Sequence, residues 1–127
     1  MANRRATSQK TKIISCDWQT VREIASALPG AEEGTSYGTP AFKVKGKLFV
    51  RFHQSGESVV ISIEIDQREQ LMKMDPESFY ITEHYTKYPW MLVRLATIGR
   101  DNLEKMIEES WRRNAPKKLV ESLIGSE

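Results

Sequence analysis

The sequence is short of the residues that cross-link a chain or bind a metal. It contains one cysteine, Cys16, so no disulfide can form within the chain. Together with His53 and His84, this makes only three Cys and His side chains, too few for a four-ligand zinc site of these residue types. We therefore expect neither a disulfide framework nor a metal, and the 127-residue chain must rely on its own hydrophobic core.

Long apolar runs are missing as well. No run approaches the roughly 20 residues of a membrane-spanning helix, and the first residues lack the apolar stretch of a secretory signal. We also find no internal repeat and no low-complexity segment. The composition, 39% hydrophobic and 28% charged, is that of an ordinary globular domain. We expect a soluble, cytoplasmic protein that does not enter a membrane.

The net charge of +2 is distributed unevenly along the chain. Four of the 19 basic residues, and none of the 17 acidic ones, lie in residues 1–12. Because this segment is polar and lacks apolar periodicity, we predict a disordered basic tail over residues 1–14 and a single domain over 15–127. The domain itself is not basic overall, so any nucleic-acid binding must use local patches.

Apolar residues at helical spacing predict four helical segments. The first covers residues 17–28, with Asp17 as its N-cap. A short helix over 66–74 opens with an Asp-x-x-Glu capping box. A longer helix covers 100–113, and a last segment covers about 119–124. The inner stripe of the longer helix is expected to hold Leu103, Met106, Ile107, Ser110 and Trp111.

Alternating apolar and polar residues predict the strands. Five strands are expected, over residues 41–45, 47–53, 59–65, 80–83 and 90–96. Residues 31–40 contain two glycines, a proline and several hydroxyl groups, and are predicted to form a loop. The fold class is α+β, with the order α-β-β-β-α-β-β-α: a two-layer domain whose antiparallel five-stranded sheet carries helices on one face.

Basic residues alternate along the first predicted hairpin. If the pleat is regular, one face of the hairpin carries Lys43, Lys45, Lys47, Phe49 and Arg51. Cations at this spacing resemble the spacing of phosphates on a nucleic-acid strand, and an exposed Phe49 could stack on an unpaired base. Arg94 joins them if the last strand turns it outward, and Lys117 and Lys118 form a second basic group. The alternative is that the lysines only keep an exposed strand soluble.

A second candidate site lies in the aromatic segment between the last two predicted strands. Four of its residues combine a titratable ring with aromatic side chains, as ligand pockets often do: His84, Tyr85, Tyr88 and Trp90. Tyr37, in the predicted loop over 31–40, is a further candidate for this pocket. The alternative is that the histidines are structural or solvated, and that the loop packs over the sheet edge.

Nothing in the sequence completes a catalytic set. Cys16, beside Asp17 at a helix start, is a candidate nucleophile whose pKa the helix could lower. It has no recognisable partner, and no carboxylate is clearly placed to assist His84. We therefore predict a protein that is not an enzyme and that uses no cofactor.

Four stretches of the sequence together resemble the MmcQ/YjbR family of small bacterial proteins. They are Leu-Pro-Gly-Ala-Glu-Glu at 28–33, Tyr-Gly-Thr-Pro-Ala-Phe-Lys-Val at 37–44, Thr-Glu-His-Tyr at 82–85 followed by Tyr-Pro-Trp-Met-Leu-Val-Arg at 88–94, and Ser-Trp-Arg at 110–112 followed by Ala-Pro-Lys-Lys-Leu at 115–119. The resemblance runs from about residue 15 to residue 124. It implies the α-β-β-β-α-β-β-α architecture, similar to type III secretion chaperones, and a DNA-binding label based on two hairpins that look like a double wing. It brings no agreed catalytic residues.

Two functions follow as expectations. The first is binding of DNA or another polyanion through the basic hairpin face, with little sequence specificity because lysines contact phosphates without reading bases. The alternative is a protein-interaction or chaperone-like module that uses an exposed apolar sheet face to bind a protein partner or to form a weak homodimer. That face would hold Phe49, Val60, Trp90 and Leu92.

Overall fold

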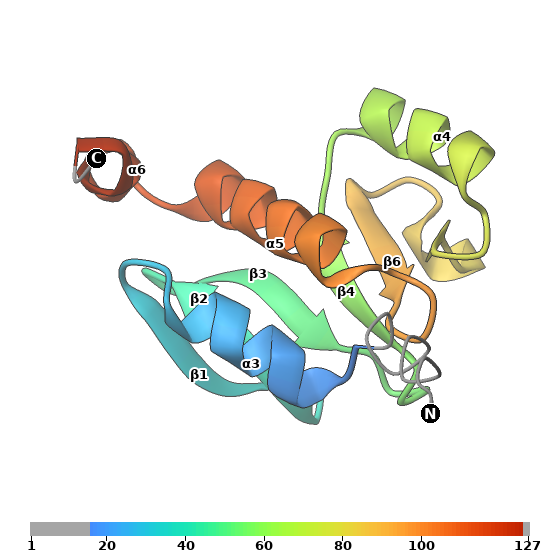
Figure 1. The fold of residues 1–127 in the computed structure, drawn as a ribbon, viewed down its shortest axis with the longest axis horizontal. Helices are drawn as coiled ribbons and strands as arrows, with labels where there is room; N and C mark the ends of the chain where they lie inside the picture. Colours follow the sequence, from blue (N-terminus) through green and yellow to red (C-terminus); the bar gives the residue numbers. More distant parts are fainter. Residues whose placement is uncertain (1–15, 126–127) are drawn as a thin grey trace, which may run out of the picture.

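The computed structural model describes residues 16–125 (Figure 1). Within them it contains six strands, four α-helices and one 3₁₀ turn. The α+β class and the antiparallel sheet are confirmed, whereas the expected number of strands and the expected element order are wrong. The basic tail predicted over residues 1–14 lies outside the described residues.

The strands form one antiparallel sheet in the order β1-β2-β3-β4-β6-β5. Along the chain the elements are α3 (Trp18–Ser26), β1 (Ala31–Ser36), β2 (Thr39–Val44), β3 (Lys47–Phe52), β4 (Ser58–Ser62), α4 (Ile65–Met74), β5 (Phe79–Tyr80), the 3₁₀ turn η1 (Glu83–Tyr85), β6 (Trp90–Arg94), α5 (Arg100–Asn114) and α6 (Lys117–Gly125).

Strand β1 replaces most of the loop that was predicted over residues 31–40. It pairs with β2 along its whole length, from Ala31 opposite Val44 to Ser36 opposite Thr39. Its side chains are mostly exposed, so no apolar alternation marks it in the sequence. The loop prediction is therefore wrong because the strand is held by backbone pairing and not by burial of its side chains.

A two-residue turn joins β1 to β2. Tyr37 and Gly38 occupy it with φ angles of 54° and 79°. Positive φ at both central residues is typical of the tight hairpin turn that Asn-Gly favours. A tyrosine in this left-handed conformation costs about 1–2 kcal/mol, so the turn is locally strained.

A β-bulge in β3 changes the expected alternation of side chains. Phe42 pairs with Val50 and Lys43 pairs with Leu48, which leaves Phe49 as the extra residue. The bulge turns Phe49 into the core, where it is 0% exposed. The prediction of an exposed Phe49 is wrong for this reason. Ser110 of α5 stabilises the bulge by donating a hydrogen bond of 2.6 Å to the carbonyl oxygen of Phe49.

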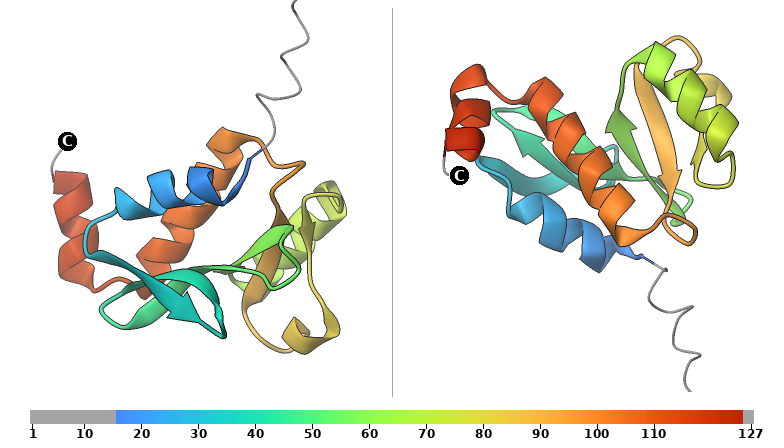
Figure 2. Two further views of the ribbon diagram at one scale, coloured as in Figure 1. Left: turned by 90° about the horizontal axis from the view of Figure 1, so that it is seen from below. Right: turned by 45° about the horizontal axis from the view of Figure 1, so that its top comes forward.

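Helices α3 and α5 cross one face of the sheet and cover the main hydrophobic core (Figure 2). The predicted N-cap is confirmed, since the Asp17 carboxylate accepts a hydrogen bond of 3.0 Å from the Thr20 backbone N–H. The predicted inner stripe of α5 is also confirmed, because all five of its residues are buried. No helix within residues 16–125 is long and apolar enough to cross a membrane.

The start of α4 and the strand expected over 80–83 differ from prediction. Helix α4 begins at Ile65, and its N-cap Glu64 makes no side-chain capping bond, so the capping box expected at residues 66–69 is wrong. Strand β5 covers only Phe79–Tyr80, because the chain then turns into η1.

The opposite face of the sheet, which we call the outer face, carries a second and smaller apolar cluster. Val60 of β4 and Leu92 of β6 form it together with Tyr85 of η1. The segment that contains η1 curls over this face, away from α3 and α5 (Figure 2). The sheet is therefore covered on one side by helices and on part of the other side by an irregular segment.

The Ser110 hydroxyl gives a testable prediction of stability. It accepts a hydrogen bond from the Ser62 backbone N–H at 3.0 Å and also donates to the Phe49 carbonyl. Ser110→Ala leaves both buried backbone groups without a partner, so we expect it to lower the free energy of unfolding by about 1–3 kcal/mol, measured by urea titration. Ser122→Ala, on exposed α6, is the control and should change it by less than about 0.5 kcal/mol. Equal effects of the two variants would contradict the role given to Ser110.

Candidate ligand-binding pocket

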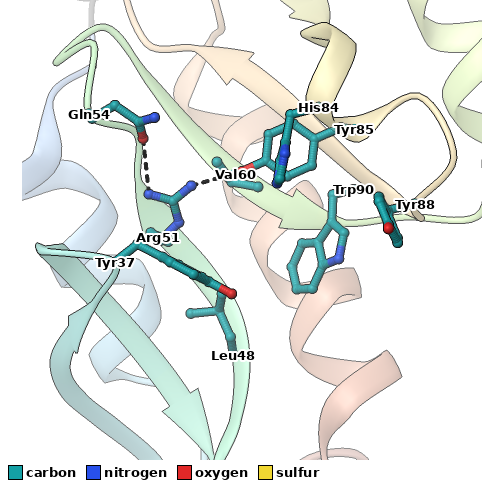
Figure 3. Close-up of a pocket in the computed structure, with 9 residues that line it drawn as sticks. All are labelled: Tyr37, Leu48, Arg51, Gln54, Val60, His84, Tyr85, Tyr88 and Trp90. Atoms are coloured by element: carbon teal, nitrogen blue, oxygen red, sulfur yellow. Dashed lines mark hydrogen bonds between the residues drawn. The ribbon is translucent and has the colours of Figure 1, made fainter.

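A cavity of about 630 Å³ opens on the outer face of the sheet (Figure 3). Its walls come from the β1–β2 turn, from β3 and β4, and from the segment between η1 and the start of β6. The residues that line it are Tyr37, Leu48, Arg51, Gln54, Val60, His84, Tyr85, Tyr88 and Trp90. The structure thus brings together all five residues of the pocket that the sequence suggested, and a ligand for them stays a prediction.

Arg51 of β3 lines this cavity and is only 4% exposed. Its Nη2 donates a hydrogen bond of 2.8 Å to the Tyr85 hydroxyl, and its Nη1 donates at 3.3 Å to the amide oxygen of Gln54 and to the Thr39 hydroxyl (Figure 3). These partners are all neutral. Among residues 16–125, no carboxylate forms an ion pair with Arg51. The prediction that Arg51 belongs to an exposed basic row is therefore wrong.

The positive charge of Arg51 also affects the pKa of a neighbouring histidine, His53. Partial burial, and then the charge of Arg51, lower the pKa of His53 below its ordinary value. The Nδ1 of His53 lies 2.9 Å from the Ser55 hydroxyl, so the ring also has a hydrogen-bond partner. His53 is thus a natural reporter of the electrostatic potential around Arg51.

A second buried arginine holds one wall of the cavity in place. Arg68 of α4 is 2% exposed, and its Nη1 donates to the backbone carbonyls of Tyr85 at 3.1 Å, Tyr88 at 2.7 Å and Trp90 at 3.0 Å. Its Nη2 donates to the Thr86 carbonyl at 3.1 Å. Three of these four carbonyls belong to residues that line the cavity. Arg68 therefore fixes the backbone of the aromatic wall.

The sequence analysis did not identify Arg68, although a signal was present. Arg68 stands three and four residues before Leu71 and Met72, which pack against the main core. Residues at this spacing share one face of a helix. A cation on the inward face of an amphipathic helix indicates a buried arginine with several acceptors.

The lysines of the first hairpin do not form a single row. Lys43 pairs with Leu48 on the outer face, whereas Lys47 pairs with Val44, whose side chain belongs to the core on the other face. Cross-strand partners share a face, so Lys43 and Lys47 lie on opposite sides of the sheet. Glu32 of β1 also stands opposite Lys43. The two-residue turn at Lys45 and Gly46 sets Lys47 opposite Val44, so the alternation that was expected to run on through the turn is broken there.

The remaining predicted cations lie elsewhere. The Arg94 guanidinium lies 4.4 Å from the centroid of the Tyr80 ring and donates to the Glu77 carbonyl, outside the cavity. Lys45, in the β2–β3 turn, is exposed, and so are Lys117 and Lys118 at the start of α6. The structure therefore separates Arg51 and Arg94 from the exposed lysines.

The apolar sheet face expected for a protein-interaction module is not exposed. Phe49 lies in the main core, and Val60 and Leu92 lie in the smaller outer cluster. Trp90 is half-buried and lines the cavity. That prediction failed because the segment around η1 covers the outer face, which the sequence did not indicate.

The pKa of Cys16 is shifted upward, whereas the sequence predicted a thiol with a lowered pKa that could act as a nucleophile. Burial raises the pKa of its thiol, Arg100 opposes this shift, and Asp17 adds to it. The thiol lies 3.5 Å from the Ile98 carbonyl oxygen, to which it donates. In the described part of the chain, no group of three or more His, Cys, Asp or Glu side chains is placed to hold a metal ion.

Loss of the Arg68 guanidinium should loosen the aromatic wall. Arg68→Met keeps an apolar stem but removes a donor from four carbonyls, and each carbonyl that is left without a partner away from water costs about 1–3 kcal/mol. We expect faster amide hydrogen exchange over residues 85–90 and a free energy of unfolding lower by about 3 kcal/mol or more. The control is Arg112→Met, which removes only an exposed ion pair with Glu108 and should cost less than about 1 kcal/mol. Unchanged exchange over 85–90 in Arg68→Met would show that the wall does not depend on this side chain.

The chain has relatives in several bacteria. A family model described as YjbR matches residues 26–113. Uncharacterized proteins of Mycobacterium bovis and Mycobacterium tuberculosis are 39% identical to this chain over 56 residues. The aligned segment is 44% of this chain and 43% of each relative. The alignment thus covers less than half the length of those relatives, and their names state no activity.

A solved structure shares the fold. The crystal structure of a Deinococcus radiodurans protein with the domain DUF419 matches with a TM-score of 0.69 and 20% sequence identity, covering 86% of this chain and 88% of that one. At this identity the likeness concerns the fold alone. The family match, in contrast, spans most of the chain and confirms the resemblance seen in the sequence: this chain belongs to the YjbR family.

Proposed function

We propose that this domain binds a small anionic molecule in the Arg51 cavity and is not an enzyme. The observation that carries the proposal is the nearly buried guanidinium of Arg51, whose hydrogen-bond partners are all neutral. A buried charge without a counter-ion is unfavourable. A bound carboxylate or phosphate would supply that counter-ion.

The hydrogen bonds of Arg51 leave suitable donors. They use Nη1 and one N–H of Nη2, so the Nε–H and the second Nη2–H have no acceptor among residues 16–125. The Nε–H and Nη2 lie on the same edge of the planar guanidinium. Such an edge binds a carboxylate or phosphate through two parallel hydrogen bonds.

The rest of the cavity supports an anion and disfavours a cation. Of the described residues that line it, Arg51 alone carries a permanent charge, and none is an Asp or Glu. The pKa of His53 is lowered first by partial burial and then by the charge of Arg51, and the second cause is consistent with a positive potential near the cavity. The size of the cavity, about 630 Å³, lies within the roughly 300–1,000 Å³ of small-molecule sites.

The two histidines allow a direct test by NMR. Bound inorganic phosphate should offset the charge of Arg51 and raise the pKa of His53, in a saturable manner, and should shift the resonances of His84 in the cavity wall. Without phosphate, Arg51→Gln should by itself raise the pKa of His53 toward its ordinary value. The same variant should weaken phosphate binding at least tenfold.

The control for this test is Arg94→Gln, which removes a cation from the same face but not from the cavity. It should leave phosphate binding and the pKa of His53 unchanged. Phosphate effects no larger than those of chloride, or equal effects of the two variants, would refute anion binding at Arg51.

A second candidate function, binding of DNA or another polyanion, is supported by a separate observation. Four exposed lysines form what we call the lysine corner: Lys45, Lys47, Lys117 and Lys118. The two pairs lie at the same end of the molecule, because α6 approaches the end of β2 beside Gly30, where a Cβ atom would lie near both Leu119 and Val44. The corner offers phosphate contacts without sequence readout.

The lysine corner predicts salt-dependent binding of a labelled duplex. Four phosphate contacts give a slope of log K against log salt of about −3.6, measured by fluorescence anisotropy. Lys45→Glu combined with Lys117→Glu should abolish binding, whereas Arg51→Gln should leave it unchanged. The absence of salt-sensitive binding below about 100 μM protein would exclude this function.

A further inference from the structure

The aromatic walls of the cavity indicate what kind of anion fits there. We infer that the ligand carries a flat aromatic ring, which stacks between Tyr37 and Trp90 while its phosphate or carboxylate binds Arg51. The inference rests on the proposed anion-binding function and names its ligand class: an aromatic anion of about the size of a nucleoside monophosphate.

Tyr37 occupies a turn position that the fold itself does not require to be a tyrosine. It holds a positive φ in a two-residue turn that favours asparagine and glycine, and its side chain is 85% exposed. Strained residues that persist in a structure often have a functional reason. The turn holds the ring beside the cavity, where it covers no part of the protein core.

One side of the Tyr37 ring is already engaged. The Arg51 guanidinium lies 5.2 Å from the ring centroid, within the range of a cation–π contact. Because the side chain is otherwise exposed, much of the ring surface is still free to stack on a ligand. Arg51 and Tyr37 together present a cation and an aromatic face to the same molecule.

The facing wall supplies the second aromatic surface. Trp90 and Tyr37 reach into the cavity from its two sides, and Leu48 lies near the Tyr37 ring (Figure 3). Tyr88, which is 56% exposed, extends this wall toward solvent. The carbonyls of Trp90 and Tyr88 are both held by Arg68, so the wall is rigid before a ligand arrives.

Apolar side chains complete the site for a ring. Leu48 and Val60 line the cavity between the aromatic walls and offer no hydrogen bond to a ligand. A ring-free anion such as inorganic phosphate would leave these surfaces exposed to water. A ring attached to the anion would bury them and add stacking to the charge interaction.

Matched pairs of ligands test the ring directly. Phenyl phosphate and methyl phosphate differ only in the ring, and AMP and ribose 5-phosphate differ only in the base. Calorimetric titration of the full chain should show at least about tenfold tighter binding for the member of each pair that carries the ring.

Tyr37 variants complete the experiment. Tyr37→Phe keeps the ring and should bind phenyl phosphate within about twofold of the original protein. Tyr37→Asn removes the ring but suits the turn better, so it should raise the thermal unfolding temperature while weakening phenyl phosphate about fivefold or more. Methyl phosphate binding should be the same in all three proteins.

The outcomes separate this inference from the proposed function. If both members of each pair bind equally, and Tyr37→Asn has no effect on affinity, the ring inference is wrong although anion binding stands. If no anion of either pair binds, the proposed function fails and the inference fails with it. Because Tyr37→Asn is expected to stabilise the fold, weaker binding by that variant cannot be attributed to unfolding.

Discussion

Four backbone carbonyl groups meet the guanidinium of Arg68, and the cavity depends on this contact. The chain between η1 and β6 follows neither a helix nor a strand, and its backbone makes local turn bonds such as that from the Tyr88 N–H to the Tyr85 carbonyl. One buried cation adds a shared donor for four carbonyls between Tyr85 and Trp90. An irregular segment can therefore keep a fixed shape over the outer face of the sheet.

Tyr85 links this contact to the candidate ligand site. Its carbonyl oxygen accepts from Arg68 of α4, and its hydroxyl accepts from Arg51 of β3. The two arginines differ in how their charge is compensated: Arg68 donates to four carbonyls and has the Glu69 carboxylate 3.7 Å from its Nε, whereas the partners of Arg51 are all neutral and its Nε–H has no acceptor among residues 16–125. The first is suited to hold structure and the second to meet a ligand, although both are almost fully buried.

Sequence patterns predicted the elements that bury an apolar face. The stripe of α5 and the cap at Asp17 follow from residue periodicity and local hydrogen bonding, and the structure has both. Strand β1 was not predicted, because its pairing uses backbone groups and its side chains are mostly exposed to water. Phe49 was misplaced because a bulge adds one residue to a period of two. The burial of Arg68 could have been inferred from its place on the inward face of α4, but the acceptors of Arg51 and Arg68 lie in distant segments, which no local pattern records.

Strand β1 also forms one edge of the sheet, where β2 is its single neighbour within residues 16–125. An open edge offers unpaired N–H and C=O groups to a second copy of the chain. Glu32 and Glu33 lie along this edge, and Arg22 holds the Glu33 carboxylate at 3.0 Å. Charged side chains along an edge strand disfavour its pairing with a second copy, so the hairpin that carries Tyr37 ends the sheet with acidic residues of this kind.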